Sequence, residues 1–242
     1  MTRLHIAIKA RLDKAVREYK MLADHDAILV AVSGGADSIA LLDLLSLHCW
    51  TFADDVSLYA AYVDLGFGER SDERCTKMKA YFEQLRIGYR IVRTDIGPYA
   101  HSEANRERPC FLCSRLRRRK IFETAENLGC NKIAFGHHKD DIIETLLMNM
   151  IWNREISTMV PNLAVFHGKY HVLRPLVYID EEMIKKYCRE RHTPTVEQEC
   201  PTDGYSRRQF IKEWLAELES NVYGARENIF ASMKRVKIDY LL

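Results

Sequence analysis

The sequence of 242 residues contains no long hydrophobic run. Its apolar stretches, such as residues 27–32, end well short of the ~18 residues that a membrane-spanning helix needs. Charged residues return soon after the N-terminus, at Lys9, Arg11 and Asp13, so no segment resembles a signal peptide. These absences predict a cytoplasmic protein that does not associate with a membrane.

Neither sign of charge is in excess. The chain has 36 Lys and Arg against 34 Asp and Glu, a formal net charge of +2. This balance excludes a protein that coats itself in nucleic acid, and any site for a polyanion must be a local patch. With 47% hydrophobic residues and no low-complexity segment, disorder is excluded as well. The length suits one large domain, or one domain with a small appendage.

The seven cysteines do not form the pattern of a disulfide protein or of a closed zinc site. Their number is odd, and no second C-x-x-C or histidine pair accompanies Cys110 and Cys113. Those two residues can form a redox dithiol, half of a zinc site or an iron–sulfur ligand pair, or their spacing is accidental. Cys200 lies in a polar loop beside Pro201 that could fold back toward the rest of the chain. No chemistry is assigned to Cys49, Cys75, Cys130 and Cys188.

Strand and helix patterns alternate along the first three quarters of the chain. Apolar, β-branched runs predict strands at 27–32, 58–63, 88–92, 132–135 and 171–176. Helical spacing predicts helices at 4–22, 37–47, 72–85, 114–128 and 140–151, then at 181–191 (after an Asp180 N-cap), 206–218 and 225–237. The alternation predicts an α/β fold with a doubly wound, parallel, five-stranded sheet. We divide the chain into an N-terminal helix (1–26), the α/β domain (27–178) and a C-terminal helical extension (179–242).

A glycine-rich turn follows the first predicted strand. Ligands bind at the carboxyl ends of strands in open α/β sheets, and that end carries Ser33, Gly34, Gly35, Asp37 and Ser38. Two glycines allow a sharp turn close to a ligand, and the first N–H groups of the next helix point at an anion. An acidic residue in a phosphate cradle requires a cation, so Asp37 predicts a Mg²⁺ site. An ordinary strand-to-helix turn is the alternative.

A second polar cluster follows the fourth predicted strand. Gly136, His137, His138, Asp140 and Asp141 should reach the same edge of the sheet as the glycine-rich turn. For His138 and Asp140, the simpler interpretation is a solvated histidine and an acid that complements the helix dipole. The shared edge favours a functional role for Asp141.

The glycine-rich turn resembles the loop of the N-type (PP-loop) ATP pyrophosphatases, which cleave ATP between the α- and β-phosphates and adenylate an acceptor. In that family the second strand ends beside the adenine, which implies an ATP contact at Val63 and Asp64. Nearly the whole chain resembles the tRNA 2-thiocytidine synthetase (TtcA) family, which converts a cytidine of the anticodon loop to 2-thiocytidine. The motifs that carry this resemblance are residues 33–38, 109–118, 136–142, 148–150 and 174–176.

The resemblance implies a 4Fe-4S cluster on Cys110, Cys113 and a third, later cysteine, which is Cys200 in this chain. Two departures from the family are visible. Ala36 stands where the family's loop commonly has lysine, so Lys139 or Mg²⁺ would have to supply that charge. The late motif has one cysteine where the family often has a pair. The identity of the modified nucleoside is left open, because related enzymes thiolate other tRNA positions.

Together these features predict an ATP-dependent tRNA sulfurtransferase. ATP would bind at Ser33, Gly34, Gly35, Asp37, Ser38, Val63, Asp64, Gly136, His137 and Asp141. The catalytic residues would be Asp37, Asp141, Cys110 and Cys113. Arginines that could bind tRNA phosphates are Arg115, Arg117, Arg118, Arg119, Arg207 and Arg208, although a solvated basic face is the alternative for each.

The implied partners are tRNA and a cysteine desulfurase or other sulfur donor, and homodimers are common among such enzymes. Two alternative functions stay open. One is a ligase of the lysidine synthetase type, which adenylates its acceptor without sulfur. The other is a zinc-bearing RNA-binding module without catalysis.

Overall fold

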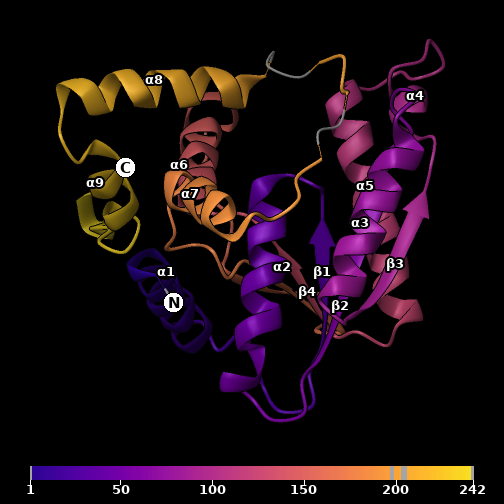
Figure 1. Ribbon diagram of the computed structural model, residues 1–242. Helices are drawn as coiled ribbons and strands as arrows, with labels where there is room; N and C mark the ends of the chain where they lie inside the picture. Colours follow the sequence, from indigo (N-terminus) through magenta and orange to yellow (C-terminus); the bar gives the residue numbers. More distant parts are fainter. Residues whose placement is uncertain (1, 197–198, 203–205, 241–242) are drawn as a thin grey trace.

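The computed structural model of the chain describes residues 2–196, 199–202 and 206–240. A six-stranded sheet lies between layers of helices (Figure 1). Its strands are β1 (Ala27–Val32), β2 (Ser57–Asp64), β3 (Gly88–Arg93), β4 (Lys132–Phe135), β5 (Asn162–Val165) and β6 (Tyr170–Leu173). The α-helices are α1 (Arg3–Glu18), α2 (Ala36–His48), α3 (Ser71–Gln84), α4 (Ile96–Ala100), α5 (Pro109–Asn127), α6 (Lys139–Met148), α7 (Glu181–Arg191), α8 (Arg207–Asn221) and α9 (Ala225–Ser232). Short helical turns are η1 (Cys49–Thr51), η2 (Asn149–Asn153) and η3 (Ile238–Tyr240). Within these residues no helix is both long and apolar enough to cross a membrane.

The strand order is β3-β2-β1-β4-β6-β5, and all neighbours are parallel except β5 and β6. The prediction of a doubly wound α/β fold is confirmed. The predicted count of five strands is one too few, because β5 forms an antiparallel hairpin with β6. Strand β5 is a four-residue edge strand with only half-buried and exposed positions, so its sequence carries no continuous apolar signal.

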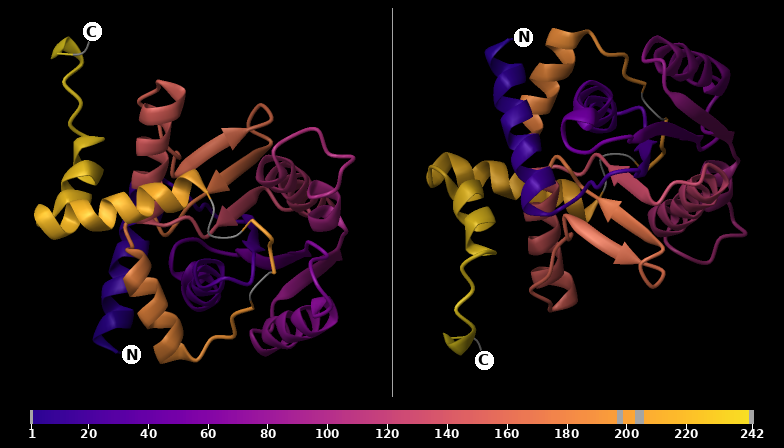
Figure 2. Two further views of the ribbon diagram at one scale, coloured as in Figure 1. Left: turned by 90° about the horizontal axis from the view of Figure 1, so that it is seen from above. Right: turned by 90° about the horizontal axis from the view of Figure 1, so that it is seen from below.

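The central strand β1 supplies side chains to both faces of the sheet. Val30 belongs to a core cluster with helices α1, α2, α3 and α7, whereas Leu29 packs on the other face against Ile121 of α5. Figure 2 shows helices on both faces in two further views. Burial on both faces explains why β1 is a continuous apolar run.

The terminal segments share the central core. Ile8 of α1 and Ile184 of α7 are fully buried in the same cluster as Val30. Helix α7 is also tied to α2, because Tyr187 donates a hydrogen bond of 2.6 Å to the buried carboxylate of Asp43. The division of the chain at residue 178 stays a prediction.

Helix α5 begins five residues earlier than predicted. Pro109 occupies its first turn, where a missing N–H has no cost. Cys110 and Cys113 therefore lie inside the first turns of a helix, and not on a loop before it. Helix α6 ends at Met148, and the expected last turn is the π-helical segment η2.

Candidate active site

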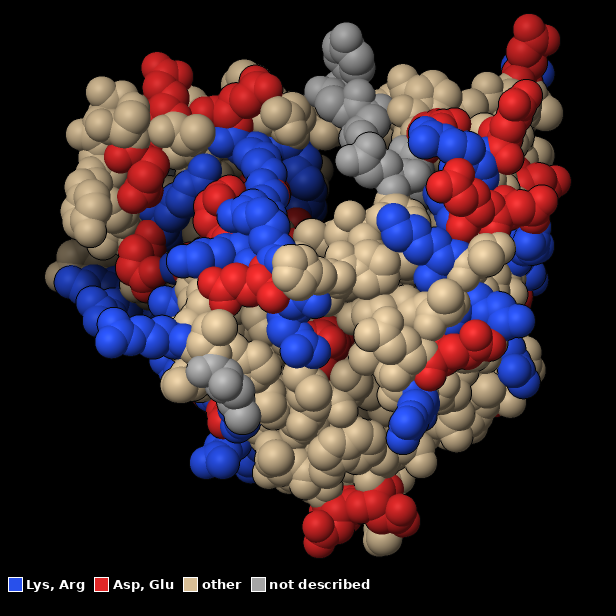
Figure 3. Space-filling model, viewed as in Figure 1, with Lys and Arg blue, Asp and Glu red and all other residues tan. Residues whose placement is uncertain are grey.

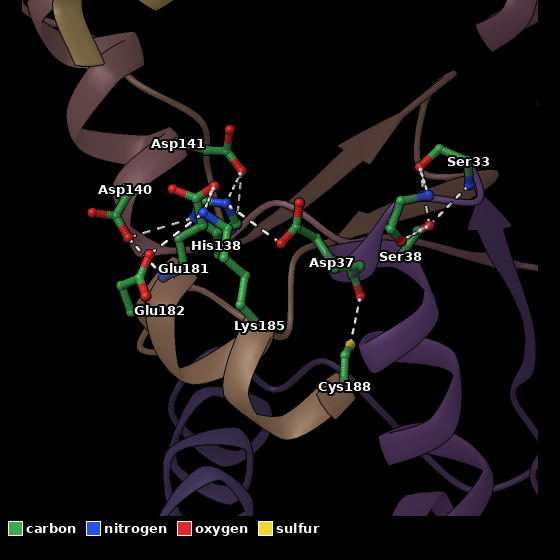
Figure 4. Close-up of polar contacts among 12 residues, drawn as sticks. Ser33, Asp37, Ser38, His138, Asp140, Asp141, Glu181, Glu182, Lys185 and Cys188 are labelled. Carbon is green, nitrogen blue, oxygen red and sulfur yellow. Dashed lines mark hydrogen bonds and ion pairs between the residues drawn. The ribbon is translucent and has the colours of Figure 1, made fainter. Parts of the chain in front are cut away.

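The carboxyl ends of β1 and β4 place two loops side by side. In the first loop, the Ser33 N–H donates to Ser38 Oγ at 3.0 Å, and Ser38 Oγ donates to the Gly35 carbonyl at 2.9 Å (Figure 4). These bonds close the turn between β1 and α2. The N–H groups at the start of α2 are thereby held at the mouth of the site.

Two glycines allow the close contacts around this turn. Gly34 has φ +91° and accepts a 2.9 Å hydrogen bond from the Val196 N–H, so the segment after α7 covers the loop. At Gly136, a Cβ would lie 2.8 Å from the backbone of Asp37 and Ser38. Only glycine lets the β4 loop approach the first turn of α2 so closely.

A cavity of about 270 Å³ opens between these loops and α5. Of the ten predicted ATP-binding residues, those lining it are Ser33, Asp37, Ser38, Gly136, His137 and Asp141. Arg117 and Arg118 of α5 line the opposite side. An adjoining cavity of about 590 Å³ shares Asp37 and Asp141 with the first. The two predicted loops therefore do form one site.

His138 lies between two carboxylates of this site (Figure 4). Its Nε2 is 3.7 Å from Asp37 Oδ1 and 3.4 Å from Asp141 Oδ2. Burial, followed by the neighbouring Asp141 charge, raises the pKa of Asp37, and His138 partly opposes this effect. Two carboxylates that face a cavity are a donor set that Mg²⁺ uses together with phosphate oxygens. His138 was expected to be solvated, but only 5% of its surface is exposed.

His137 is a neutral ring on the cavity wall. It stacks on Phe135 with centroids 5.7 Å apart, and burial lowers its pKa to about 4. Its Nδ1 is buried and has no partner among the described residues.

Val63 and Asp64 do not line the cavity as the described residues form it. Both are about 1% exposed. Asp64 accepts a hydrogen bond of 2.5 Å from Ser71 and lies 3.6 Å from the buried Arg74. The Asp64 carboxylate thus serves a buried ion pair, and the ATP contact at Val63 and Asp64 stays a prediction.

Lys139, one candidate for the charge that Ala36 lacks, is paired with two carboxylates. Its Nζ donates to Asp180 at 3.0 Å and to Glu227. The lysine therefore ties α6 to α7 and α9. A role of Lys139 in phosphate binding stays a prediction.

Arg117 places a cation on the wall of the cavity. It lies one helical turn after Cys113 and lines the cavity opposite the glycine-rich turn. Its Nε is buried without a partner among the described residues, and burial lowers its pKa. An anion bound in the cavity would stabilise this guanidinium.

The three predicted cluster ligands lie together. Cys110 Sγ and Cys200 Sγ are each 3.4 Å from the hydroxyl oxygen of Thr202. Burial raises the pKa of Cys113, Arg117 lowers it, and Cys200 and Cys110 raise it further. Across the described ranges, no trio of Cys, His, Asp or Glu has the spacing of a preformed metal site. Three sulfurs at one place are nevertheless the donor set that an iron–sulfur cluster uses.

Comparison with known proteins agrees with this geometry. The family model described as the PP-loop domain matches residues 4–219. A tRNA-cytidine(32) 2-sulfurtransferase of Methylobacillus flagellatus is 37% identical over 94% of this chain and 75% of its own length. The enzyme of the same name from Geobacter sulfurreducens is 34% identical over 97% of this chain and 91% of its own. This chain belongs to the PP-loop family, in the group of the tRNA 2-sulfurtransferases.

Solved structures show that this PP-loop fold is shared more widely. The U34-tRNA thiolase NcsA from Methanococcus maripaludis, solved with its 4Fe-4S cluster, has a TM-score of 0.76 at 21% identity, over 97% of this chain and 80% of its own. An NH3-dependent NAD synthetase from Campylobacter jejuni has a TM-score of 0.53 at 14% identity. The match covers 97% of this chain and 93% of the synthetase chain. At these identities the likeness concerns the fold alone.

The predicted tRNA-binding arginines of this PP-loop protein occupy different surroundings. Arg117 faces the cavity, and the partly exposed Arg208 is paired with Asp141 and Glu144, at 2.7 and 3.1 Å. The remaining four are solvent-exposed, namely Arg115, Arg118, Arg119 and Arg207. Figure 3 shows Lys and Arg side chains on both sides of a hollow between the α8 and α5 regions of this face.

Sequence reasoning missed two residues beside the cysteines of this PP-loop site. The Thr202 hydroxyl contacts two thiols, and His101 Nε2 lies 3.3 Å from the same hydroxyl. His101 is held on Phe67 by an edge-to-face contact with centroids 5.4 Å apart. Neither residue belongs to a motif, and only the folding of the 199–202 segment onto α4 and α5 brings them together.

Proposed function

We propose that this chain is an ATP-dependent tRNA sulfurtransferase that replaces a base carbonyl oxygen with sulfur. Cytidine C2 in the anticodon loop is the proposed target, because the curated relatives named above are tRNA-cytidine(32) 2-sulfurtransferases. The observation that carries the proposal is Arg117, which lines the cavity opposite the glycine-rich turn and also lies beside Cys113, the thiol next to Cys110 and Cys200.

The glycine-rich turn would hold the phosphates of ATP. Ser33, Ser38 and the first N–H groups of α2 donate to phosphate oxygens, and Asp37 with Asp141 would hold Mg²⁺ against them. The base carbonyl oxygen attacks the α-phosphorus, a new P–O bond forms, and pyrophosphate leaves with the electrons of the broken bond. A sulfur nucleophile then adds to the activated carbon, and AMP leaves with the original oxygen.

Arg117 would serve the reaction in place of the family's loop lysine. A cation opposite the turn stabilises the negative charge that develops on the α-phosphate. Ala36 cannot do this, and Lys139 is engaged elsewhere. Arg117 is the buried guanidinium on the cavity wall with an unpartnered Nε among the described residues.

Cys110, Cys113 and Cys200 would hold a 4Fe-4S cluster. Three protein ligands leave one iron free to carry sulfide, which is the chemistry that the cluster supplies when bound. Burial raises the pKa of Cys113, and Arg117 beside it partly offsets this shift toward the thiolate form that binds iron. The sulfur itself would come from a cysteine desulfurase or another donor.

Mass spectrometry of tRNA nucleosides tests the proposal. The anaerobically reconstituted protein is incubated with tRNA, ATP and sulfide, and we expect a thiolated nucleoside that depends on ATP. Cys110→Ser should abolish the product, while Cys75→Ser, which changes a buried thiol on α3, should not. An adenylated or ligated base without sulfur would contradict the proposal in favour of a lysidine-type ligase.

Metal analysis separates the proposal from the zinc-bearing module. We expect iron and acid-labile sulfide in the anaerobically purified protein, and their loss in Cys200→Ser. A colourless protein that contains zinc would contradict the proposed cluster.

A salt titration tests the exposed arginines. Each phosphate contact contributes about 0.7–0.9 to the slope of log affinity against log salt. Arg118→Gln should lower both the affinity for tRNA and this slope. An unchanged slope would show that Arg118 belongs to an ordinary solvated face.

A further inference from the structure

A second, largely apolar depression lies next to the proposed active site. Its volume is about 440 Å³, and it is formed by α5 and the β5–β6 hairpin. Both views of Figure 2 show the hairpin beside α5. Aromatic rings form its floor, and Lys and Arg side chains form much of its rim. The proposed chemistry uses none of these rings.

Three rings make up the floor. Phe122 contacts Phe166 and Tyr170 edge to face, with centroids 5.3 and 5.5 Å apart, and Phe166 contacts Tyr170 at 6.0 Å. Tyr170 is 6% exposed, whereas Phe166 is 63% exposed. The buried rings therefore support one ring that faces solvent.

The backbone holds Phe166 in this exposed position at an energetic cost. Phe166 and His167 have φ values of +51° and +56°, in the left-handed region that bulky residues avoid. The hairpin turn is closed by hydrogen bonds from Gly168 N–H to Val165 and from Lys169 N–H to Phe166. The turn bears this strain although most of the Phe166 ring surface faces water and only part of it packs on Phe122 and Tyr170.

Arg118 joins this depression to the proposed active site, because it lines both cavities. The other cations of the rim have carboxylate partners: Arg115 pairs with Glu107, Arg119 with Glu123 and Lys169 with Glu126. Among the described residues, Arg118 has no ion-pair or hydrogen-bond partner. An uncommitted guanidinium thus lies between a polar cavity and an aromatic surface.

We propose that the Phe122, Phe166 and Tyr170 depression is a base-stacking subsite for an unpaired nucleotide adjacent to the target nucleotide of the RNA substrate. The target base enters the cavity at the glycine-rich turn, Arg118 binds the intervening phosphate, and the neighbouring base stacks on Phe166. Unpaired bases are commonly recognised by aromatic rings and arginine together. This inference rests on the proposed function, since it requires an RNA substrate.

RNA fits the depression better than a protein partner does. A protein segment would need only the apolar floor of the depression. The rim, however, carries four cations and two acids. Arg118, the cation without a carboxylate partner among the described residues, favours a phosphate as its ligand. Continuity with the proposed active site through Arg118 also favours the substrate itself. A sulfur-donor protein or a second copy of this chain is the competing occupant.

Binding of a fluorescent anticodon stem-loop RNA to the full chain tests the subsite. Removing a stacking ring typically weakens RNA binding by about 5- to 100-fold. We expect Phe166→Ala to show this loss with unchanged ATP affinity, and Phe166→Trp to bind like wild type. Trp50→Ala is the matched control, because Trp50 is a 54% exposed ring at the far end of α2 from the glycine-rich turn.

Photo-crosslinking locates the stacked base. The same RNA carries 5-iodouridine at either nucleotide flanking the target, and irradiation should produce an adduct on the peptide containing Phe166 and Tyr170. Phe166→Leu should reduce the yield of this adduct. Because leucine keeps an apolar side chain at this position, the crosslinking result remains interpretable even if Phe166→Ala folds poorly.

The outcomes separate the subsite from the proposed function. If wild-type protein binds no tRNA, the proposed function fails. If wild type binds tRNA but Phe166→Ala binds it equally well and the adduct lies elsewhere, the subsite alone is overturned. Loss of self-association or of binding to a cysteine desulfurase in Phe166→Ala, with RNA binding unchanged, would assign the depression to a protein.

Discussion

The Arg208 guanidinium of α8 lies 2.7 Å from the Asp141 carboxylate of α6, at the border of the candidate active site. The same guanidinium is 3.1 Å from Glu144, whose side chain is 4% exposed. One arginine therefore neutralises two acids and fastens the C-terminal helices to the α/β core. The structure shows these two ion pairs within the protein, and the contact to tRNA that the sequence suggested for Arg208 stays a prediction.

Removing this charge should destabilise the protein in a pH-dependent way. Burial raises the pKa of Glu144 and Arg208 lowers it, so in Arg208→Gln the carboxylate loses its main opposing charge. We expect a loss of about 1–3 kcal/mol in the free energy of unfolding at neutral pH. The loss should be smaller at pH 5, where the carboxyl can bind a proton. Urea unfolding at the two pH values measures this, and a loss that grows toward acid would contradict it.

Arg117→Met should weaken ATP binding. Hydrogen bonds to charged groups contribute about 1.5–3 kcal/mol, so the affinity should fall about 10- to 100-fold. Arg119→Met is the control, because Arg119 lies on the same helix but is exposed and paired with Glu123. Equilibrium dialysis with ATP and Mg²⁺ measures both variants, and equal affinities for them would remove Arg117 from the site. The iron content of each preparation shows whether the cysteine site is retained.

Gly136→Ala should disturb the site through the backbone. The new Cβ would lie 2.8 Å from backbone atoms of Asp37 and Ser38, which cannot move without shifting the start of α2. We expect a loss of about 1–3 kcal/mol in stability together with weaker ATP binding. Gly35→Ala is the control for stability, because its Cβ would meet only Ser33 Oγ, at 3.5 Å. Similar unfolding curves for the two variants would refute this account.

Stability should fall in mild acid because of His137. Its pKa is about 4 in the folded protein against 6.5 in the unfolded chain, so the unfolded state binds more protons between these values. The neutral His137 ring contributes fully to the free energy of unfolding above pH 6.5, and this contribution is lost as the pH falls toward 4. It amounts to at most about 3 kcal/mol. His137→Asn should flatten this part of the curve of unfolding free energy against pH, and a steeper acid loss in the variant would contradict the assignment.

Local patterns in the sequence predicted most of the α/β core. Residues 27–32 are apolar without interruption because β1 is buried on both faces, and residues 132–135 matched β4 to the residue. The edge strand β5 was missed for the opposite reason. Half of its side chains are exposed, and it is held by pairing with β6, a contact that no local pattern encodes.

The candidate site was predicted where its residues adjoin strand ends. The glycine-rich turn and the His137 loop meet because the carboxyl ends of parallel strands share one edge, which is a property of the fold class. Asp64 is the last residue of strand β2, but its carboxylate lies against Arg74. The direction of a side chain depends on partners that are distant in the sequence.

The sequence by itself determined the fold class, the family and the set of chemical groups, because strand periodicity, glycine turns and motif spacing are local. Tertiary structure alone decided which groups face one another. Arg117 and Arg118 are consecutive in a basic run, yet the rotation of α5 turns Arg117 to the cavity and leaves Arg118 between that cavity and the rings of the β5–β6 hairpin. The packing of α8 on α6 likewise placed Arg208 against Asp141, since burial requires a charge to be paired.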